Sequence, residues 1–225
     1  MTLTIPPSVN SHLPAALLPQ QAAPTTARWT EPVDQLHPRE LAQALQTYFD
    51  AMSDPRFTET ITKKSLQRVA DGRPLNGVPP THTQIEIAQE VLKRKDLFQQ
   101  LDFTSGKDGQ ISRDDLATET GDFQRLSDRA LITLVGKHFN EFGGGDKYVN
   151  FTELREASGE LPSANTFSPQ ARGVAQALLK RKELLDRLDI GVGFLGFSGT
   201  QDQRFDQRNV EYTRTHSSPE FHYPD

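Results

Sequence analysis

An internal repeat limits the folds available to this chain more than any other feature of its sequence. The segment AQEVLKRKDLFQQLD, from Ala88 to Asp102, closely matches AQALLKRKELLDRLD, from Ala175 to Asp189, which lies 87 residues later. Apolar residues fall at the same positions in both copies, and their spacings of three and four residues place them on one face of a helix. A repeat of this period indicates duplicated units that bury a core only when they pack together.

Capping signals predict where these two helices begin. Thr83 and Glu86 have the spacing of a capping box, in which each side chain bonds to the other residue's backbone amide. Ser168 followed by Pro169 is typical of an N-cap and a first helical residue, because the amide that proline lacks is unpaired in a first turn anyway.

Both copies contain the sequence Lys-Arg-Lys, at Lys93–Lys95 and Lys180–Lys182. Such a cluster can bind an anionic ligand, or it can lie on a solvated helix face and pair with acids four residues away, as Glu90 would with Arg94. We expect the second arrangement.

Four short segments share a pattern that is the second half of an EF-hand calcium loop: a polar residue, an apolar residue three positions later, a cap-former and, in three of the four, an acid or amide three residues after that. They are Thr58–Leu66, Asp108–Leu116, Asp146–Leu154 and Asp202–Val210. In such loops the apolar residue pairs with the neighbouring loop in a short strand, and the next residue caps the outgoing helix. The apolar residues are Ile61, Ile111, Val149 and Phe205, and the predicted caps are Thr62, Ser112, Asn150 and Asp206. The predicted fold class is therefore all-α, with four EF-hand-like helix–loop–helix units in two duplicated pairs.

Calcium is a hard cation that takes about 6–8 oxygen ligands, so a calcium loop needs several acidic residues in a tight turn. The second and third loops offer Asp102, Asp108 and Asp115, and Asn140, Asp146 and Glu153. Each spans 14 residues, against 12 in a standard loop. The first and fourth loops carry Ser65 and Asn209 where a carboxylate is required, and we expect no metal there. The alternative for the second and third loops is that Ser112 with Asp115, and Asn150 with Glu153, are only helix capping boxes.

The first 38 residues differ in composition from the rest. They hold seven of the 15 prolines, and no acidic residue precedes Glu31. Proline fixes φ and removes an amide donor, so we expect a disordered leader, and one reading of it is an ordinary mobile terminus. The other is an export signal, because Leu3 and Ile5, the lack of early acids and the richness in Ser, Gln and Pro resemble the leaders of type III secreted proteins of plant-associated bacteria. The predicted organisation is a leader at 1–38, a first pair at 39–125, a second pair at 126–212 and a flexible tail at 213–225.

The recurring loops resemble the EF-hand-like repeats of the NolX/HrpF translocator family, which plant-associated bacteria secrete by type III systems. The stretch DGQISRDDL after LFQQLDFTSGK carries this resemblance most clearly, and it covers roughly residues 39–212. It implies a secreted helper or effector protein, acting in virulence. Translocators of that family also carry long apolar C-terminal segments, which residues 213–225 do not supply, so we do not expect pore formation.

Composition excludes several classes of function. The chain has 25 basic and 30 acidic residues, which argues against nucleic acid as a partner. It has no cysteine, and no apolar run approaches the roughly 20 residues that span a bilayer. We find no catalytic motif, and we expect no enzyme. His138, next to Phe139, is expected on a helix surface or at the edge of the core.

These observations favour a secreted protein that binds a protein partner, from a host or from the secretion system, with calcium as a possible modulator. The glycine-rich stretch Gly191–Gly199 contains Phe194, Leu195 and Phe197, which are the predicted partner-binding residues. The alternatives are a calcium sensor or buffer in the bacterial cytoplasm and, less favoured, an enzyme with an unrecognised site.

Overall fold

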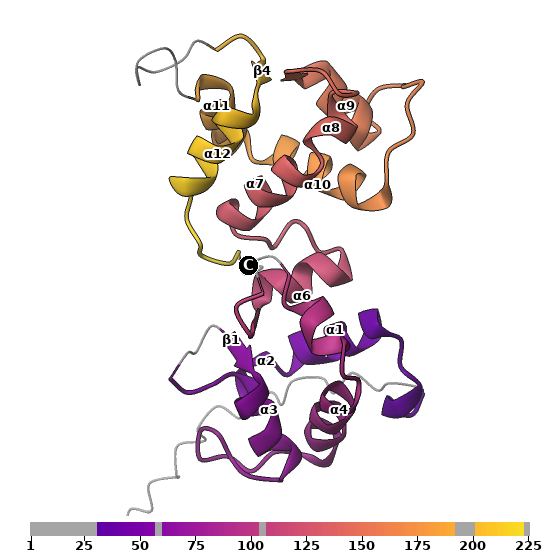
Figure 1. Cartoon of the computed structure of the whole chain (residues 1–225), viewed down its shortest axis with the longest axis vertical. Coiled ribbons are helices and arrows are strands. Elements are labelled where there is room, and N and C mark those ends of the chain that lie inside the picture. The colour runs from indigo at the N-terminus through magenta and orange to yellow at the C-terminus, as the bar shows by residue number, and fades with distance from the viewer. Residues whose placement is uncertain (1–30, 57–59, 104–106, 192–200, 223–225) are drawn as a thin grey trace, which may run out of the picture. The chain divides into compact units, whose positions relative to one another are not determined.

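The computed structural model describes residues 31–56, 60–103, 107–191 and 201–222. Residues 31–225 belong to one compact unit, which contains both predicted halves. The described chain is mainly helical, as the sequence predicts, with two small antiparallel sheets (Figure 1).

The elements of the first half are η1 (Val33–Gln35), α1 (Pro38–Thr47), α2 (Phe49–Met52), β1 (Thr60–Thr62), α3 (Lys63–Ala70), α4 (His82–Lys93), α5 (Leu97–Leu101), β2 (Gln110–Ser112) and α6 (Arg113–Thr120). Those of the second half are α7 (Asp128–Lys137), α8 (Phe139–Phe142), β3 (Val149–Asn150), α9 (Phe151–Ser158), α10 (Pro169–Lys180), α11 (Lys182–Ile190), β4 (Arg204–Phe205) and α12 (Gln207–Thr215). The order of elements is thus repeated, apart from η1.

The strands join the loops as the sequence predicts. Ile61 of β1 lies opposite Ile111 of β2, and Val149 of β3 lies opposite Phe205 of β4. All four side chains are buried. The residue after each of them is the N-cap of the outgoing helix, and the four confirmed caps are Thr62, Ser112, Asn150 and Asp206.

The apolar stripe predicted one continuous helix in each copy of the repeat. The structure instead shows two helices in each copy. Helix α4 ends at Lys93 and α10 ends at Lys180, and α5 and α11 follow as separate helices. The break falls at the arginine of each Lys-Arg-Lys sequence. Arg94 donates to the carbonyls of Asp34 and Leu36, at 3.0 and 2.7 Å.

Arg181 makes the same kind of contact in the second half. It donates to the carbonyls of Gln124 and Leu126, at 2.9 and 2.6 Å, and to Asp128 Oδ1 at 2.9 Å. The predicted ion pair between Glu90 and Arg94 is present at 2.7 Å. Each arginine therefore fixes the segment that leads into the first long helix of its half.

The start of α4 also differs from the prediction. Its N-cap is Thr81, whose hydroxyl accepts from the amide of Gln84, while the Gln84 side chain accepts from the amide of Thr81. The prediction that Thr83 and Glu86 form the capping box of this helix is therefore wrong. Thr81 directly follows Pro79 and Pro80, which favour extended backbone, so the helix begins at the first residue that can cap it. Ser168 and Pro169 begin α10 as predicted.

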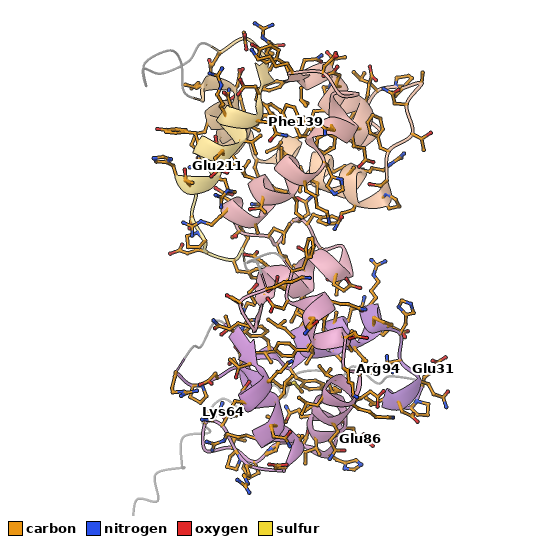
Figure 2. All side chains as sticks on the ribbon, in the orientation of Figure 1. Glu31, Lys64, Glu86, Arg94, Phe139 and Glu211 are labelled. Atoms are coloured by element: carbon orange, nitrogen blue, oxygen red, sulfur yellow. The ribbon has the colours of Figure 1, made fainter. Side chains whose placement is uncertain are left out.

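Apolar residues are buried in both halves, and those from Ala117 to Val210 form a hydrophobic core cluster. In the second half Phe139 meets Phe205 edge to face, with ring centroids 6.0 Å apart, and Figure 2 shows Phe139 among the helices while Glu211 lies at the surface.

Packing also extends past the boundaries predicted for the leader and the tail. Leu36 is buried ahead of residue 39, and the segment predicted as a flexible tail contains the end of α12 and a bond from the His222 amide to the Arg125 carbonyl, at 2.9 Å.

Candidate functional site

The second loop places two carboxylates in the interior. Asp102 follows the last residue of α5 and is 3% exposed, and Asp115 lies in the first turn of α6 and is 2% exposed. Asp102 Oδ2 accepts from the amide of Gly109 at 2.8 Å, whereas Asp102 Oδ1 is buried without a hydrogen-bond partner. A buried polar atom without a partner costs about 1–3 kcal/mol, so this oxygen needs an explanation.

Asp115 accepts hydrogen bonds from two residues, Phe103 and Ser112, within the described ranges. Its Oδ1 accepts from the amide of Phe103 at 3.1 Å, and its Oδ2 accepts from the amide and hydroxyl of Ser112, at 2.7 and 2.6 Å. The capping box that the sequence allowed is thus present. The bond from Phe103 goes beyond a capping box, because it ties Asp115 to the residue next to Asp102.

The surroundings of Asp102 disfavour the ionised form of its carboxyl group. Burial raises the pKa of Asp102; the bond from Gly109 opposes this, and the charges of Asp108 and Asp115 raise the pKa further. Within the described ranges, no lysine, arginine or histidine forms an ion pair with Asp102. Asp108 itself is exposed, and its Oδ1 accepts from the amide of Gln110 at 2.9 Å.

The fourth loop serves as an internal comparison. Asp189 corresponds to Asp102 and is also buried, at 4% exposure, but its Oδ1 accepts from the amides of Asp202 and Arg204 at 3.1 and 3.2 Å. Asn209 stands in the place of Asp115, and its amide donates to the carbonyls of Leu188 and Asp189 at 3.1 and 3.4 Å. The described residues of this loop therefore supply hydrogen-bond partners for both Asp189 Oδ1 and the Asn209 amide.

The third loop is arranged differently from the second. Asn140 and Asp146 are exposed, and Glu153 Oε2 accepts from the Asn150 amide at 2.8 Å, which is the capping-box arrangement. In the part of the chain that the structure describes, no group of three or more histidine, aspartate or glutamate side chains is placed to hold a metal. Among the predicted metal ligands, Asp102 and Asp115 are therefore the pair that the structure brings together in the interior.

His138 belongs to a polar network that holds the start of α10. Its Nδ1 lies 2.8 Å from Glu141 Oε2 and its Nε2 lies 3.1 Å from Gln170 Oε1. The Ser168 hydroxyl donates to Glu141 Oε2 at 3.2 Å. Burial alone would raise the pKa of Glu141, but the bonds from Ser168 and His138 bring it below its usual value. The serine and the histidine both bond to the glutamate, and Ser168 is the N-cap of α10.

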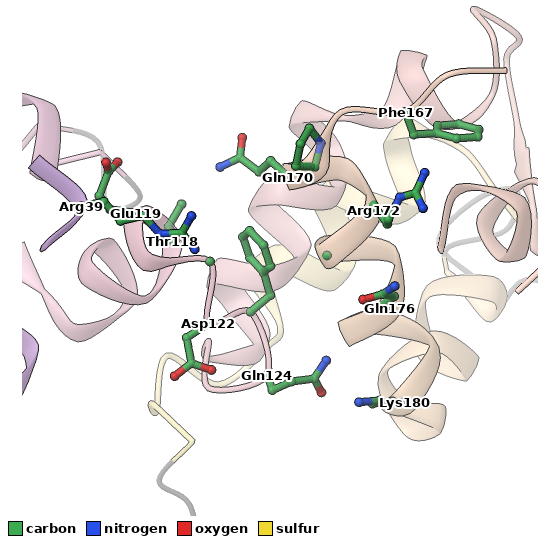
Figure 3. A pocket seen from close by; sticks show the side chains of 14 residues that line it. Arg39, Thr118, Glu119, Asp122, Gln124, Phe167, Gln170, Arg172, Gln176 and Lys180 are labelled. Carbon is green, nitrogen blue, oxygen red and sulfur yellow. The ribbon is translucent and has the colours of Figure 1, made fainter. Parts of the chain in front are cut away.

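A cleft of about 860 Å³ lies between segments that are distant in the sequence, namely α1, the end of α6 with the residues after it, and α10 (Figure 3). Phe123 and Phe167 are buried in its lining, whereas Arg172 and Lys180 are exposed. The residues that line it are Arg39, Thr118, Glu119, Gly121, Asp122, Phe123, Gln124, Phe167, Pro169, Gln170, Arg172, Gly173, Gln176 and Lys180. The sequence could not indicate this cleft, because no local pattern links these segments.

The predicted partner-binding residues Phe194, Leu195 and Phe197 lie outside the described residues. Among the helices that the structure describes, none has the length and apolar character needed to cross a membrane. The chain is matched by no protein-family model, no curated protein and no solved structure.

Proposed function

We propose that this chain is a partner-binding helical module of four EF-hand-like units in two pairs, and that its second loop binds a divalent cation such as calcium. The paired strands and the capped helix after each of them support the EF-hand-like arrangement. The observation that carries the cation site is Asp102 Oδ1, which is buried without a partner in the same loop as the buried Asp115.

A divalent cation would remove the electrostatic cost of this loop. Two buried carboxylates repel each other, and one hard cation between them neutralises both charges. Asp102 and Asp115 supply part of the oxygen shell, and water and backbone carbonyls would supply the rest. The fourth loop meets the same need with the amide of Asn209, so it requires no cation.

Calorimetric titration of the full chain with calcium tests this site. We expect saturable binding of about one ion per chain, and loss of that binding in Asp102→Asn. The matched control is Glu153→Gln in the third loop, where the carboxylate caps a helix, and this variant should bind as the wild type does. An absence of binding at millimolar calcium would remove the cation from the proposal.

The cleft is the surface that we assign to a protein partner, and its charges favour an acidic segment. Arg39, Arg172 and Lys180 line it, and none of them forms an ion pair within the described residues. Of the two acids in the lining, Asp122 is already paired with Arg125 at 3.5 Å. The cleft is thus locally cationic in a chain of net charge −5.

Labelled peptides of defined charge test this assignment by fluorescence anisotropy. A glutamate-rich peptide should bind more tightly than a lysine-rich peptide of equal length, and its affinity should fall with salt. The double variant R172E/K180E should reverse this preference. Equal binding of the two peptides would contradict the assignment.

Export by a type III system, and action in a host cell, rest on the family resemblance and on the composition of residues 1–38. Fusion of these residues to a reporter enzyme in a type III-competent bacterium tests both. Secretion of the reporter supports an exported protein. Retention in the cytoplasm favours the alternative, a calcium sensor or buffer that works inside the bacterium.

A further inference from the structure

We infer that a pocket in the first half receives one large apolar side chain from an acidic segment of a protein partner. The pocket has a volume of about 290 Å³ and is lined by residues of α2, the end of α3, the loop that follows it and the start of α4. Helices α3 and α4 pack against each other (Figure 1). The pocket shares no lining residue with the cleft, so this inference goes beyond the proposed function and is tested separately from it.

The lining of this pocket is mostly apolar. Val69, near the end of α3, is 1% exposed, and Ala51, Leu75 and Pro80 are half-buried. Val78 lies at the rim and is 69% exposed, more than any other large apolar side chain that the structure describes. A single exposed valine is ordinary, but a valine beside an apolar pocket extends the surface that a partner side chain can bury.

The second half has a polar link at the corresponding place. Glu141 is the third residue of α8, and its Oε2 accepts from the hydroxyl of Ser168, the N-cap of α10, at 3.2 Å. The third residue of α2 is Ala51, and the N-cap of α4 is Thr81. The methyl group of an alanine cannot make the bond that Glu141 makes. The first half therefore lacks this link, and both Ala51 and Thr81 line the pocket instead.

The loop between α3 and α4 is restrained at both ends. Arg68 donates to the carbonyl of Pro74 at 2.9 Å, and its own carbonyl accepts from the Arg73 amide at 2.8 Å. At the other end, Pro79 and Pro80 lead directly into the cap of α4, and each proline fixes φ. A loop with little freedom to lose binds a partner at a smaller entropic cost.

The charges in the lining indicate the class of partner. Arg73 is exposed, and it forms no ion pair within the described residues. Asp50, the acid in the lining, is paired with Arg113 at 2.5 Å. The pocket therefore offers an unpaired cation beside an apolar surface, which suits an apolar residue with a carboxylate next to it.

The size of the pocket indicates how much of the partner enters it. Sites for drug-sized ligands have volumes of about 300–1,000 Å³, and this pocket lies just below that range. Protein interfaces commonly place one aromatic anchor residue in a pocket of the other protein. A single phenylalanine flanked by glutamates is thus the simplest probe of the proposed contact.

Fluorescence anisotropy of labelled peptides with the full chain tests the pocket. One peptide carries a phenylalanine flanked by glutamates, and the other has alanine in place of the phenylalanine. The phenylalanine peptide should bind the wild type about tenfold more tightly, because only its ring fills the pocket. This ratio of affinities is the readout, since both peptides have the same charge and the cleft attracts them equally.

Variants in the pocket should reduce the ratio, and variants elsewhere should not. Ala51→Leu fills the pocket and should bring the ratio close to one. Val78→Ser acts at an exposed position and should lower the ratio about threefold with the fold intact. Tyr212→Ser, at an exposed apolar residue of α12, is the matched control, and the cleft variant R172E/K180E should also keep the wild-type ratio.

The charge at the rim is tested with the same peptides. Arg73→Glu should weaken binding of the glutamate-flanked phenylalanine peptide and strengthen binding of one flanked by lysines. Unchanged affinities for both peptides would contradict an acidic partner segment at this pocket.

The outcomes separate the pocket from the cleft. Equal affinities of the phenylalanine and alanine peptides, or no binding of either at millimolar concentration, would overturn the inference. A ratio that persists in both Ala51→Leu and Val78→Ser would overturn it as well. Loss of the ratio in R172E/K180E alone would assign the phenylalanine to the cleft, so the pocket would fail while the cleft assignment stood. Circular dichroism checks that each variant folds, and Val78→Ser carries the test if Ala51→Leu does not fold.

Discussion

Asp115 in the second loop and Asn209 in the fourth occupy the same position, three residues after the N-caps Ser112 and Asp206, and they bond in opposite senses. The carboxylate of Asp115 accepts hydrogen bonds from Phe103 and Ser112, whereas the amide of Asn209 donates to the carbonyls of Leu188 and Asp189. The described residues thus place the Asp102 and Asp115 carboxylates in the second loop at the positions where the fourth loop has Asp189 and the amide of Asn209. This contrast within one chain is the basis for assigning a cation to only one of the two loops.

Replacing Asp102 by asparagine should stabilise the calcium-free protein. The substitution removes a buried charge that the charges of Asp108 and Asp115 disfavour. We expect a gain of about 1–2 kcal/mol in the free energy of unfolding at pH 7, measured by denaturant titration with a chelator present.

The gain in the free energy of unfolding from Asp102→Asn should increase with pH. Because the folded-state pKa of Asp102 is raised, the folded wild type binds its proton more readily than the unfolded chain does. The penalty is therefore absent below the ordinary aspartate pKa of about 4 and grows as the pH rises through the raised value. The gain in Asp102→Asn should vanish at acid pH. A gain that is constant with pH would contradict this explanation.

Replacing Glu141 by glutamine should have the opposite pH dependence. The pKa of Glu141 is lowered in the folded state, so its contribution is present above the ordinary glutamate pKa of about 4.3 and is lost as the pH falls through the folded value. We expect Glu141→Gln to cost about 1 kcal/mol at pH 7 and almost nothing near pH 3.

The exposed pair of Glu160 and Arg155 provides a control for that measurement. Glu160→Gln should change the free energy of unfolding by less than about 0.5 kcal/mol at either pH, because surface ion pairs contribute little. Equal effects of the two substitutions would show that the network of His138, Glu141 and Ser168 does not stabilise the fold.

The arginine of each Lys-Arg-Lys sequence should matter more than its lysine neighbours. Arg181→Lys keeps the charge but loses the planar fork that reaches two carbonyls and Asp128, so it should cost about 1–3 kcal/mol. Lys182→Ala, at an exposed neighbour, should change stability by less than about 0.5 kcal/mol. Chemical denaturation of both variants gives this comparison, and a larger cost for the lysine would contradict it.

The Phe123 ring packs directly against Gly173 of α10, in the space that a side chain at that position would occupy. A Cβ atom at Gly173 would lie 2.3 Å from Phe123 Cδ2, far inside van der Waals contact. Gly173→Ala should therefore cost about 1–3 kcal/mol through displacement of the ring. In a Phe123→Ala background the same change should be neutral or stabilising, because the alanine then contributes only its better helix propensity. Additive effects in this double-mutant cycle would contradict the packing described.

Local signals predicted the strands and caps because they are carried by adjacent residues. In each loop an apolar residue followed by a cap-former marks the strand and the helix start, as at Ile111 and Ser112. The predicted start of α4 was wrong because Thr81 and Thr83 can both cap a helix. Pro79 and Pro80 favour extended backbone directly before Thr81, so the helix is capped there. The break at Arg94 depends on Leu36, far away in the sequence, and no local pattern predicts it.

The candidate site was only partly readable from the sequence. The acid at Asp115 and the amide at Asn209 are visible in the loop alignment, so the sequence shows which of the two loops has a carboxylate at that position. That Asp102 is buried with one oxygen unpartnered depends on how α5 and α6 meet. The Ser127 amide and hydroxyl donate to Asp114 and so join two predicted units, and no pattern within one unit predicts these bonds.

The most direct test of the cation site is a calcium titration followed by two-dimensional NMR of backbone amides. The amides of Phe103 and Gly109 donate to Asp115 and Asp102, and those of Asp202 and Arg204 donate to Asp189 in the fourth loop. We predict that the Phe103 and Gly109 signals shift with saturating calcium while the Asp202 and Arg204 signals stay in place. Signals that do not move at millimolar calcium, or that move equally in both loops, would contradict a cation site specific to the second loop.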